Sequence, residues 1–326
     1  MKHIKNSRRQ LCAIALLACT FANAFAQTDT WPSRPIKLVA PSAPGGATDS
    51  VGRILGRYLE PILKQPVVVD ARPGAGAVLG TQFVKNALPD GYTFLISGSS
   101  THSANPFLFA KLPYDPQKDF RDVGMVGFIP AIGMVNKSSA IRSSADLIRF
   151  AKANPGKLTY GYATSSSQVP PAIIKSRATV DMLGAPYKSL GQIITDLAGG
   201  TIDFAFLDIM SASPALQNPN IIAIATTSLQ RLPSMPSVPT VAEALPGFEI
   251  QSWIGIAAPV DTPTPIVEKM NGLLRQALTD PIVRSSLERL GMTVQLMTMQ
   301  EMADFAVADR KRWGEWVRIA KIEPTQ

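Results

Sequence analysis

The sequence has almost no cysteine or histidine, and this scarcity excludes several chemistries. Its 326 residues contain two of each. Cys12, Cys19 and His3 lie within the first 26 residues, which have the features of a cleaved segment, so His102 is the one histidine expected to remain. One histidine without cysteine cannot build the usual nitrogen and sulfur ligand sets of zinc, and no Asp-x-Asp-x-Asp calcium loop is present. We therefore predict no metal, no cofactor and no disulfide.

Beyond its N-terminus the sequence also lacks an apolar run of the ~20 residues that a membrane span needs. The N-terminal run, residues 11–22, is too short for a bilayer and follows a basic segment at residues 2–9. Residues 24–26, Ala-Phe-Ala, then match the small-x-small rule for signal cleavage. We predict a secretory signal peptide over residues 1–26, cut after Ala26, and hence a protein of the periplasm.

Two features leave the export route open. Ser7-Arg8-Arg9-Gln10-Leu11 resembles a twin-arginine signal, although an ordinary basic segment with two arginines has the same appearance. Leu16-Leu17-Ala18-Cys19 loosely resembles a lipoprotein cleavage box, which would attach lipid at Cys19. The Ala-x-Ala cut is the cleaner match, so a cleaved soluble form is the prediction.

A strong charge of one sign is missing too. The formal net charge is +8 at pH 7, and loss of the four basic signal residues (8 − 4) leaves +4. Nucleic-acid binding needs a clustered basic face, and the sequence has no such cluster. This modest positive balance suits a small anionic ligand, and we predict a monomer that binds no nucleic acid.

Short apolar segments alternate with helix-like segments, which is typical of an α/β fold with parallel strands. The strand-like segments are 36–40, 66–70, 92–96, 158–163, 182–185, 204–209, 221–226 and 253–257. The tail after the last of these predicts helices over 264–278, 281–290 and 299–319.

The length of the chain without the signal favours two domains. We infer that the tail returns to the first domain, so that the central block is an insertion. The predicted domains are residues 27–128 plus 253–326, and residues 129–252, with a ligand cleft between them.

Three polar loops follow strands and precede helices, where open α/β sheets bind ligands. The first has glycines that let the backbone approach an anion at a helix start; a plain capped turn is the alternative. The second crowds hydroxyls, an amide and the histidine, which can hydrogen-bond a carboxylate or form a polar surface loop. The third sets hydroxyls before a helix whose first position suits Pro170 or Pro171. The candidate ligand-binding residues are Ser42, Pro44, Gly45, Gly46, Ala47, Thr48 and Asp49; Ser99, Ser100, Thr101, His102 and Asn105; and Thr164, Ser165 and Ser166.

Several motifs occur in a fixed order along the chain. They are Trp31-Pro32-Ser33-Arg34-Pro35-Ile36, Pro44-Gly45-Gly46-Ala47-Thr48-Asp49, Asp70-Ala71-Arg72-Pro73-Gly74-Ala75-Gly76, Pro89-Asp90-Gly91-Tyr92-Thr93, Leu112-Pro113-Tyr114-Asp115-Pro116, Pro186-Tyr187-Lys188, Val238-Pro239-Thr240-Val241-Ala242-Glu243-Ala244 and Ser252-Trp253. In this order they resemble the Bug family, the substrate-binding proteins of tripartite tricarboxylate transporters. The resemblance covers essentially the whole chain after the signal.

The resemblance implies a two-domain Venus-flytrap fold of the periplasmic binding proteins (type II-like), without enzymatic activity. It implies capture of a small carboxylate, a dicarboxylate in our prediction, for a tripartite tricarboxylate transporter in the membrane; a sensor is the alternative partner. In the family, the first loop holds one carboxylate, partly through ordered water. The Ser99-Ser100-Thr101 loop and its counterpart in the second domain hold the other, and the resemblance also places Asp208 at the cleft.

Two departures from the family pattern matter. The family usually has an aromatic residue where this chain has Ser42, and its third loop is Gly-rich and followed by a histidine that is absent here. Loss of the aromatic side chain should enlarge the pocket. The hypothesis is therefore a bulkier ligand than a C4 dicarboxylate, for example an aromatic one such as a phthalate.

The enzyme alternative is a secreted hydrolase of small esters that uses His102. It has little support, because no Gly-x-Ser-x-Gly elbow is present and sequence neighbours seldom form a triad. Residues 74–80 mimic a dinucleotide fingerprint with the wrong spacing, which favours a Gly-rich turn. Lys175, Arg177 and Lys188 either face the cleft or lie on solvated surfaces.

Overall fold

The computed structural model of the chain describes residues 31–325. The signal peptide, the twin-arginine motif and Cys19 lie outside the described residues, so these remain predictions. From Pro35 onward the described chain forms one compact unit. No helix between residues 31 and 325 is both long enough and apolar enough to cross a membrane.

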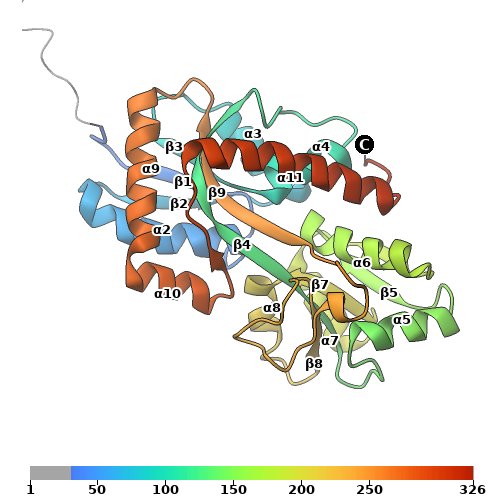
Figure 1. Cartoon of the computed structure of the whole chain (residues 1–326). Helices are drawn as coiled ribbons and strands as arrows, with labels where there is room; N and C mark the ends of the chain where they lie inside the picture. The colour runs from blue at the N-terminus through green and yellow to red at the C-terminus, as the bar shows by residue number, and fades with distance from the viewer. Residues whose placement is uncertain (1–30, 326) are drawn as a thin grey trace, which may run out of the picture. The chain divides into compact units, whose positions relative to one another are not determined.

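The long strand β4 (Phe120–Asn136) organises the sheet. Its first part pairs antiparallel with β9 (Gln251–Pro259). Its last part pairs antiparallel with β7 (Phe204–Asp208) and β8 (Ile221–Thr226). Figure 1 shows β4 running diagonally through the fold beside β9. Strand β4 thus joins two groups of strands, which we call the first and the second half-sheet.

Each half-sheet has a parallel core, as the alternating pattern predicts. In the first, β1 (Ile36–Ala40) lies between β2 (Val67–Ala71) and β3 (Thr93–Gly98), and β3 pairs antiparallel with β9. In the second, β5 (Thr159–Tyr162) lies between β7 and β6 (Leu183–Pro186). The strand order is β2-β1-β3-β9-β4-β7-β5-β6, and the short β10 (Thr293–Val294) pairs with β4. The expectation of a mixed α/β fold is confirmed.

The glycines of β4 let neighbours approach its backbone. A Cβ at Gly127 would lie 2.4 Å from the Thr293 carbonyl oxygen, so a side chain there would push β10 away. At Gly133 a Cβ would lie 2.7 Å from the Phe206 ring. The strand shifts register between Asp122 and Gly124 and again before Gly127. Residues 120–136, an apolar run that three glycines and Pro130 interrupt in the sequence, therefore form one bulged strand.

Helices cover both half-sheets. They are α2 (Ala47–Leu63), α3 (Val78–Lys85), α4 (Asn105–Leu108), α5 (Ser144–Ala153), α6 (Ser165–Ala178), α7 (Leu190–Gly199), α8 (Ile209–Ala215), α9 (Thr264–Thr279), α10 (Pro281–Arg289) and α11 (Met299–Ile319), with a π-helix at Ser99–Ala104 and 3₁₀ turns at Ala75–Ala77 and Val241–Glu243.

The C-terminal helix α11 carries the pattern of a buried stripe. Met302, Ala306, Asp309, Trp313 and Val317 are buried along one face, with the spacing of an amphipathic helix. Trp313 and Val317 pack into the same apolar cluster as side chains of β7 in the second half-sheet. Helix α11 therefore contacts the second half-sheet as well as the first. Helix α9 packs against α2 and β4, and α10 packs against α2 and β10.

Most elements agree with the sequence within a few residues, and the third loop is the main correction. Helix α6 begins at Ser165, five residues before the predicted position of Pro170. The Ser167 hydroxyl accepts the Thr164 N–H at 3.0 Å, which fixes the start of the helix at the hydroxyl run. The prolines lie in the second turn instead. The π-helix, α4, α8, β4 and β10 have no counterpart among the predicted helices and strands.

Candidate functional site

The carboxyl ends of β1, β3, β5 and β7 open onto one cavity of about 590 Å³, which we call the cleft cavity. Its lining comes from both half-sheets, including Ile129 of β4 and Trp253 of β9, the two strands that connect them. Strand carboxyl ends are where open α/β sheets place their ligands. The volume is in the usual range of small-molecule sites, roughly 300–1,000 Å³.

The first loop sets the N-terminus of α2 against the cavity. Gly46 is the N-cap of α2 and has no side chain to satisfy the N–H groups of the first turn. The loop is held from behind, because the Asp49 carboxylate accepts the Gly45 N–H at 2.9 Å and pairs with Arg53 at 2.8 Å. Although burial acts to raise the pKa of Asp49, hydrogen bonds from Arg53 and Gly45 lower it overall. Asp49 therefore positions the loop as a carboxylate.

Close packing within this loop requires glycine at position 46. A Cβ there would lie 2.8 Å from the Ser42 hydroxyl and 3.0 Å from the Ala43 carbonyl oxygen. The Ser42 hydroxyl is itself 2.7 Å from the Thr48 hydroxyl. The loop is thus a small, donor-rich wall at a helix start, where the helix dipole and free N–H groups favour an anion.

The second loop is the π-helix after β3. The Ser99 hydroxyl accepts the Trp253 N–H at 2.9 Å, and the Thr101 hydroxyl accepts the Gly98 N–H at 3.0 Å. Both hydroxyls therefore fasten the π-helix to β3 and β9. Ser100 instead reaches across to the second half-sheet, with its hydroxyl 2.8 Å from that of Ser165.

The third loop begins α6. The Ser167 hydroxyl accepts the N–H groups of Ala163 and Thr164, each at 3.0 Å. The Thr164 and Ser166 hydroxyls lie 2.9 Å apart, and both residues line the cleft cavity. A second helix start thus faces the same space as α2.

Two further helices begin at the cavity. Ser189 caps α7 by accepting the Gln192 N–H at 3.4 Å, and Asp208 caps α8 by accepting the Ser211 N–H at 3.0 Å. The Ser211 hydroxyl also donates to Asp208, at 2.9 Å. Burial raises the pKa of Asp208, although these hydrogen bonds act to lower it. The convergent helix starts make the cavity favourable for anions.

Most of the predicted ligand residues meet here. Those that line the cleft cavity are Ser42, Pro44, Gly45, Gly46, Ala47, Thr48, Ser99, Ser100, Thr101, Thr164, Ser166 and Asp208. The other four, Asp49, Ser165, His102 and Asn105, do not form part of its lining. Asp49 and Ser165 support the lining through the bonds described above. The Asn105 amide donates to the Gly76 carbonyl and the Tyr114 hydroxyl, so it braces the loop before α3.

His102 lies in the core. It is 1% exposed, its Nδ1 is 2.8 Å from the Thr101 hydroxyl, and its ring packs against Phe120 and Trp253. Burial, with a smaller contribution from Arg310, lowers the pKa of His102 to about 3. The imidazole is therefore neutral and out of reach of a cleft ligand, which removes the base that an esterase would need.

Sequence reasoning missed two segments of the cavity wall, although it left open that Lys188 faces the cleft. Residues 73–77, which follow β2, and Lys188, Ser189, Leu190 and Gly191, which follow β6 and begin α7, all contribute to the lining. Both segments follow a strand and lead into a helix, and the same rule applied to them would have found them. The side chains contributed by β4 and β9 carry no such local signal.

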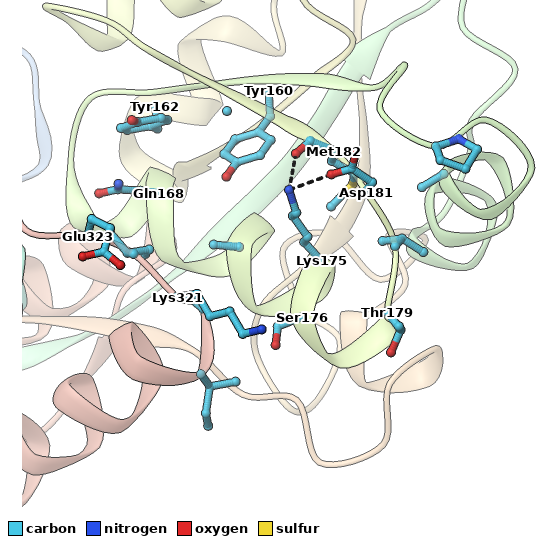
Figure 2. Close-up of a pocket in the computed structure, with 18 of the residues that line it drawn as sticks. Tyr160, Tyr162, Gln168, Lys175, Ser176, Thr179, Asp181, Met182, Lys321 and Glu323 are labelled. Carbon is cyan, nitrogen blue, oxygen red and sulfur yellow. Dashed lines mark hydrogen bonds and ion pairs between the residues drawn. The ribbon is translucent and has the colours of Figure 1, made fainter.

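A second, larger cavity of about 840 Å³, which we call the lateral cavity, has the opposite polarity. The C-terminal ends of α5, α6 and α11 contribute to its walls, as do Tyr160 and the C-terminal segment up to Thr325. Figure 2 shows Lys175 reaching Asp181 and the Met182 carbonyl oxygen, at 2.8 and 2.9 Å. Helix C-termini favour cations, and this cavity's own lysines already supply them. The cleft cavity is therefore the candidate anion site.

Comparison with known proteins identifies the class of protein to which the chain belongs. The model of the tripartite tricarboxylate transporter family receptor matches residues 51–322. Protein BugT of Bordetella pertussis is 32% identical over 320 residues, which are 96% of this chain and 98% of BugT. The solved structure of R. palustris Rpa4515 with adipate has a TM-score of 0.87 and 31% identity, over 90% of this chain and 100% of that one. MatC (Rpa3494) from Rhodopseudomonas palustris with bound malate has a TM-score of 0.81 and 31% identity, over 88% and 100%.

An α/β fold whose strand ends open onto a cavity between two half-sheets defines a solute-binding protein of the periplasmic binding class. Within that class the chain belongs to the tripartite tricarboxylate transporter receptor family, the Bug family. Members of this family are periplasmic receptors and not enzymes. The predicted family, fold class and lack of enzymatic activity are thereby confirmed.

Proposed function

We propose that this protein captures a small dicarboxylate in the cleft cavity and delivers it to the membrane subunits of a tripartite tricarboxylate transporter. The single observation that carries the ligand class is the uncapped start of α2 at Gly46, on the wall of a cavity that other helix starts also face. Backbone N–H groups of this kind bind a carboxylate without a buried counter-charge.

The relatives agree with an organic acid as ligand. The structures of Rpa4515 and MatC were solved with adipate and malate, both dicarboxylates. The serine at position 42 bears on ligand size, because it lines the cavity where the family usually has an aromatic residue. Its hydroxyl lies 2.7 Å from that of Thr48, and a serine side chain fills less of the cavity than an aromatic ring would. We therefore favour a ligand bulkier than malate, such as a phthalate.

Capture by closure of two domains is part of this proposal. The proposed domains are residues 27–128 plus 253–326, and residues 129–252, so that β4 and β9 cross between them where Phe128 pairs with Trp253 and Ile129 pairs with Ser252. A ligand that contacts both domains prefers the closed form, and that preference drives closure. Secretion as a monomer with the signal cut after Ala26 completes the proposal.

A thermal-shift screen of residues 27–326 tests the function. The library should hold aliphatic dicarboxylates, tricarboxylates, phthalates, matched monocarboxylates and acidic amino acids. A ligand at 100 times its dissociation constant stabilises the folded state by ~2.7 kcal/mol, which such a screen detects readily. We expect the largest shift from a dicarboxylate. No shift from any member, after unfolding and refolding to remove co-purified ligand, would overturn the proposal.

A further inference from the structure

The cleft cavity has very few charged side chains. Among the described residues that line it, only Lys188 and Asp208 have side chains that carry a formal charge, and arginine is absent. Its remaining lining is backbone, hydroxyl and apolar side chains, including Ile129, Ile194 and Pro214. The charge that the cavity prefers in a ligand therefore depends on which hydrogen bonds and ion pairs these two side chains already make within the protein.

Asp208 is engaged within its own helix. One carboxylate oxygen accepts the Ser211 N–H at 3.0 Å and the other accepts the Ser211 hydroxyl at 2.9 Å. The residue is 7% exposed and serves as the N-cap of α8. Its negative charge is thus directed at a helix start and is partly neutralised there.

Lys188 has no such engagement. It is exposed, and no ion pair involves it within residues 31–325. The carboxylate of Asp196, on the following helix α7, already accepts a hydrogen bond from the Tyr187 hydroxyl at 2.7 Å. The Ser189 hydroxyl next to it accepts the Gln192 N–H. Lys175, in the lateral cavity, shows the contrast, since Asp181 and the Met182 carbonyl oxygen hold its ammonium group.

Lys188 and the start of α2 lie in different proposed domains. Gly46 follows β1 in the first half-sheet, and Lys188 follows β6 in the second. Apolar residues such as Ile129 and Ile194 contribute to the lining of the same cavity. This arrangement suits a molecule with two anionic ends and an apolar middle, and one that contacts both domains.

We propose that Lys188 determines specificity by pairing with the second carboxylate of a ligand whose first carboxylate lies at the start of α2. The protein then selects dicarboxylates with an apolar spacer over monocarboxylates of the same length. This inference rests on the proposed function and deepens it.

Calorimetric titration of Lys188→Met against matched acids tests the inference. Adipate and phthalate are the dicarboxylate probes, and hexanoate and benzoate are their monocarboxylate counterparts. A hydrogen bond to a charged group is worth enough to predict a loss of about 10-fold in dicarboxylate affinity. The monocarboxylates should change by less than about twofold, since they present no second anion. Lys188→Glu should reduce adipate binding further and improve binding of 6-aminohexanoate, whose ammonium group would meet the new carboxylate.

Lys175→Met is the matched control, because Lys175 lies on α6 in the same proposed domain and lines the other cavity. It should leave all four affinities unchanged. Equal weakening of mono- and dicarboxylates in Lys188→Met, or no weakening of either, overturns the inference while the proposed function stands. Failure of the wild-type protein to bind any of the four acids or the wider library overturns the proposed function, and this inference with it.

Discussion

The two ends of helix α6 face two different cavities, and the difference shows what makes a binding site for anions. At its start, Thr164 and Ser166 line the cleft cavity; at its end, Lys175, Ser176 and Thr179 line the lateral cavity. The helix dipole places partial positive charge at the first end and partial negative charge at the second. The same helix therefore presents partial charges of opposite sign to the two cavities.

The volumes of the two cavities do not indicate which of them binds the ligand. The lateral cavity is the larger, about 840 Å³ against about 590 Å³. Its Lys175 ammonium group is already held by the Asp181 carboxylate and the Met182 carbonyl oxygen, at 2.8 and 2.9 Å. In the cleft cavity the start of α2 has no capping side chain. A site is indicated by polar groups that the fold orients and leaves to a ligand, and volume alone does not indicate one.

The largest expected effect is loss of binding on adding one methyl group at the start of α2. In Gly46→Ala the new Cβ would lie 2.8 Å from the Ser42 hydroxyl and 3.0 Å from the Ala43 carbonyl oxygen, so the loop must shift. The N–H groups would then miss the carboxylate, and hydrogen bonds to a charged group are worth about 1.5–3 kcal/mol. We expect dicarboxylate affinity to fall roughly 100-fold in calorimetry.

Gly272→Ala provides the control for this prediction. Gly272 lies within α9, and a Cβ there would meet no atom within 4 Å. Alanine at that position should retain wild-type affinity. If Gly46→Ala also retained it while remaining folded, the α2 start would not be the anion site, and the contrast between the two cavities would lose its basis.

Local signals explain how much of this site could be predicted. Glycines before Asp49 and the apolar period of α2 are short-range features, so the first loop and its helix were predictable from sequence. The direction of a side chain is set by packing that the sequence does not show. Asp49 turns back to Gly45 and Arg53, and His102 turns into the core against Trp253. Both were therefore assigned to the ligand although they do not line the cavity.

The second and third loops were harder to predict for a related reason. A run of serines and threonines has no hydrophobic period, so neither the π-helix after β3 nor the true start of α6 was recognised. Prolines usually mark the first turn of a helix, but Pro170 and Pro171 lie in the second turn of α6. The cap made by the Ser167 hydroxyl decided the start instead.

A smaller effect is expected in the lateral cavity, on stability at high pH. Burial, with a contribution from Tyr162, raises the pKa of Tyr160 from 10.0 to about 12. Because the folded-state pKa is raised, the stability contributed by the neutral phenol is complete below pH 10 and is lost as the pH rises through 12. Tyr160→Phe should therefore match the wild type at pH 7 and exceed its free energy of unfolding by about 1 kcal/mol at pH 11.

Denaturant unfolding at both pH values measures this difference, and ligand affinity at pH 7 is the second readout. We expect Tyr160→Phe to bind dicarboxylates as the wild type does, because Tyr160 lines only the lateral cavity of the two. A loss of affinity in this variant would show that the lateral cavity takes part in ligand binding, contrary to the separation drawn above.

The smallest effect is expected from the same substitution at the two ends of α6. The hydroxyls of Ser165 and Ser100 are 2.8 Å apart and join the second half-sheet to the π-helix of the first. Loss of one neutral hydrogen bond costs about 0.5–1.5 kcal/mol. If this bond exists only when the proposed domains are closed, Ser165→Ala should weaken ligand binding roughly fivefold, mainly by faster dissociation. Ser176→Ala, at the other end of the helix, should leave the rates of ligand association and dissociation unchanged. Equal dissociation rates in the two variants, measured by stopped-flow, would mean that the Ser100–Ser165 contact persists in the open form, so that closure must be held by the ligand alone.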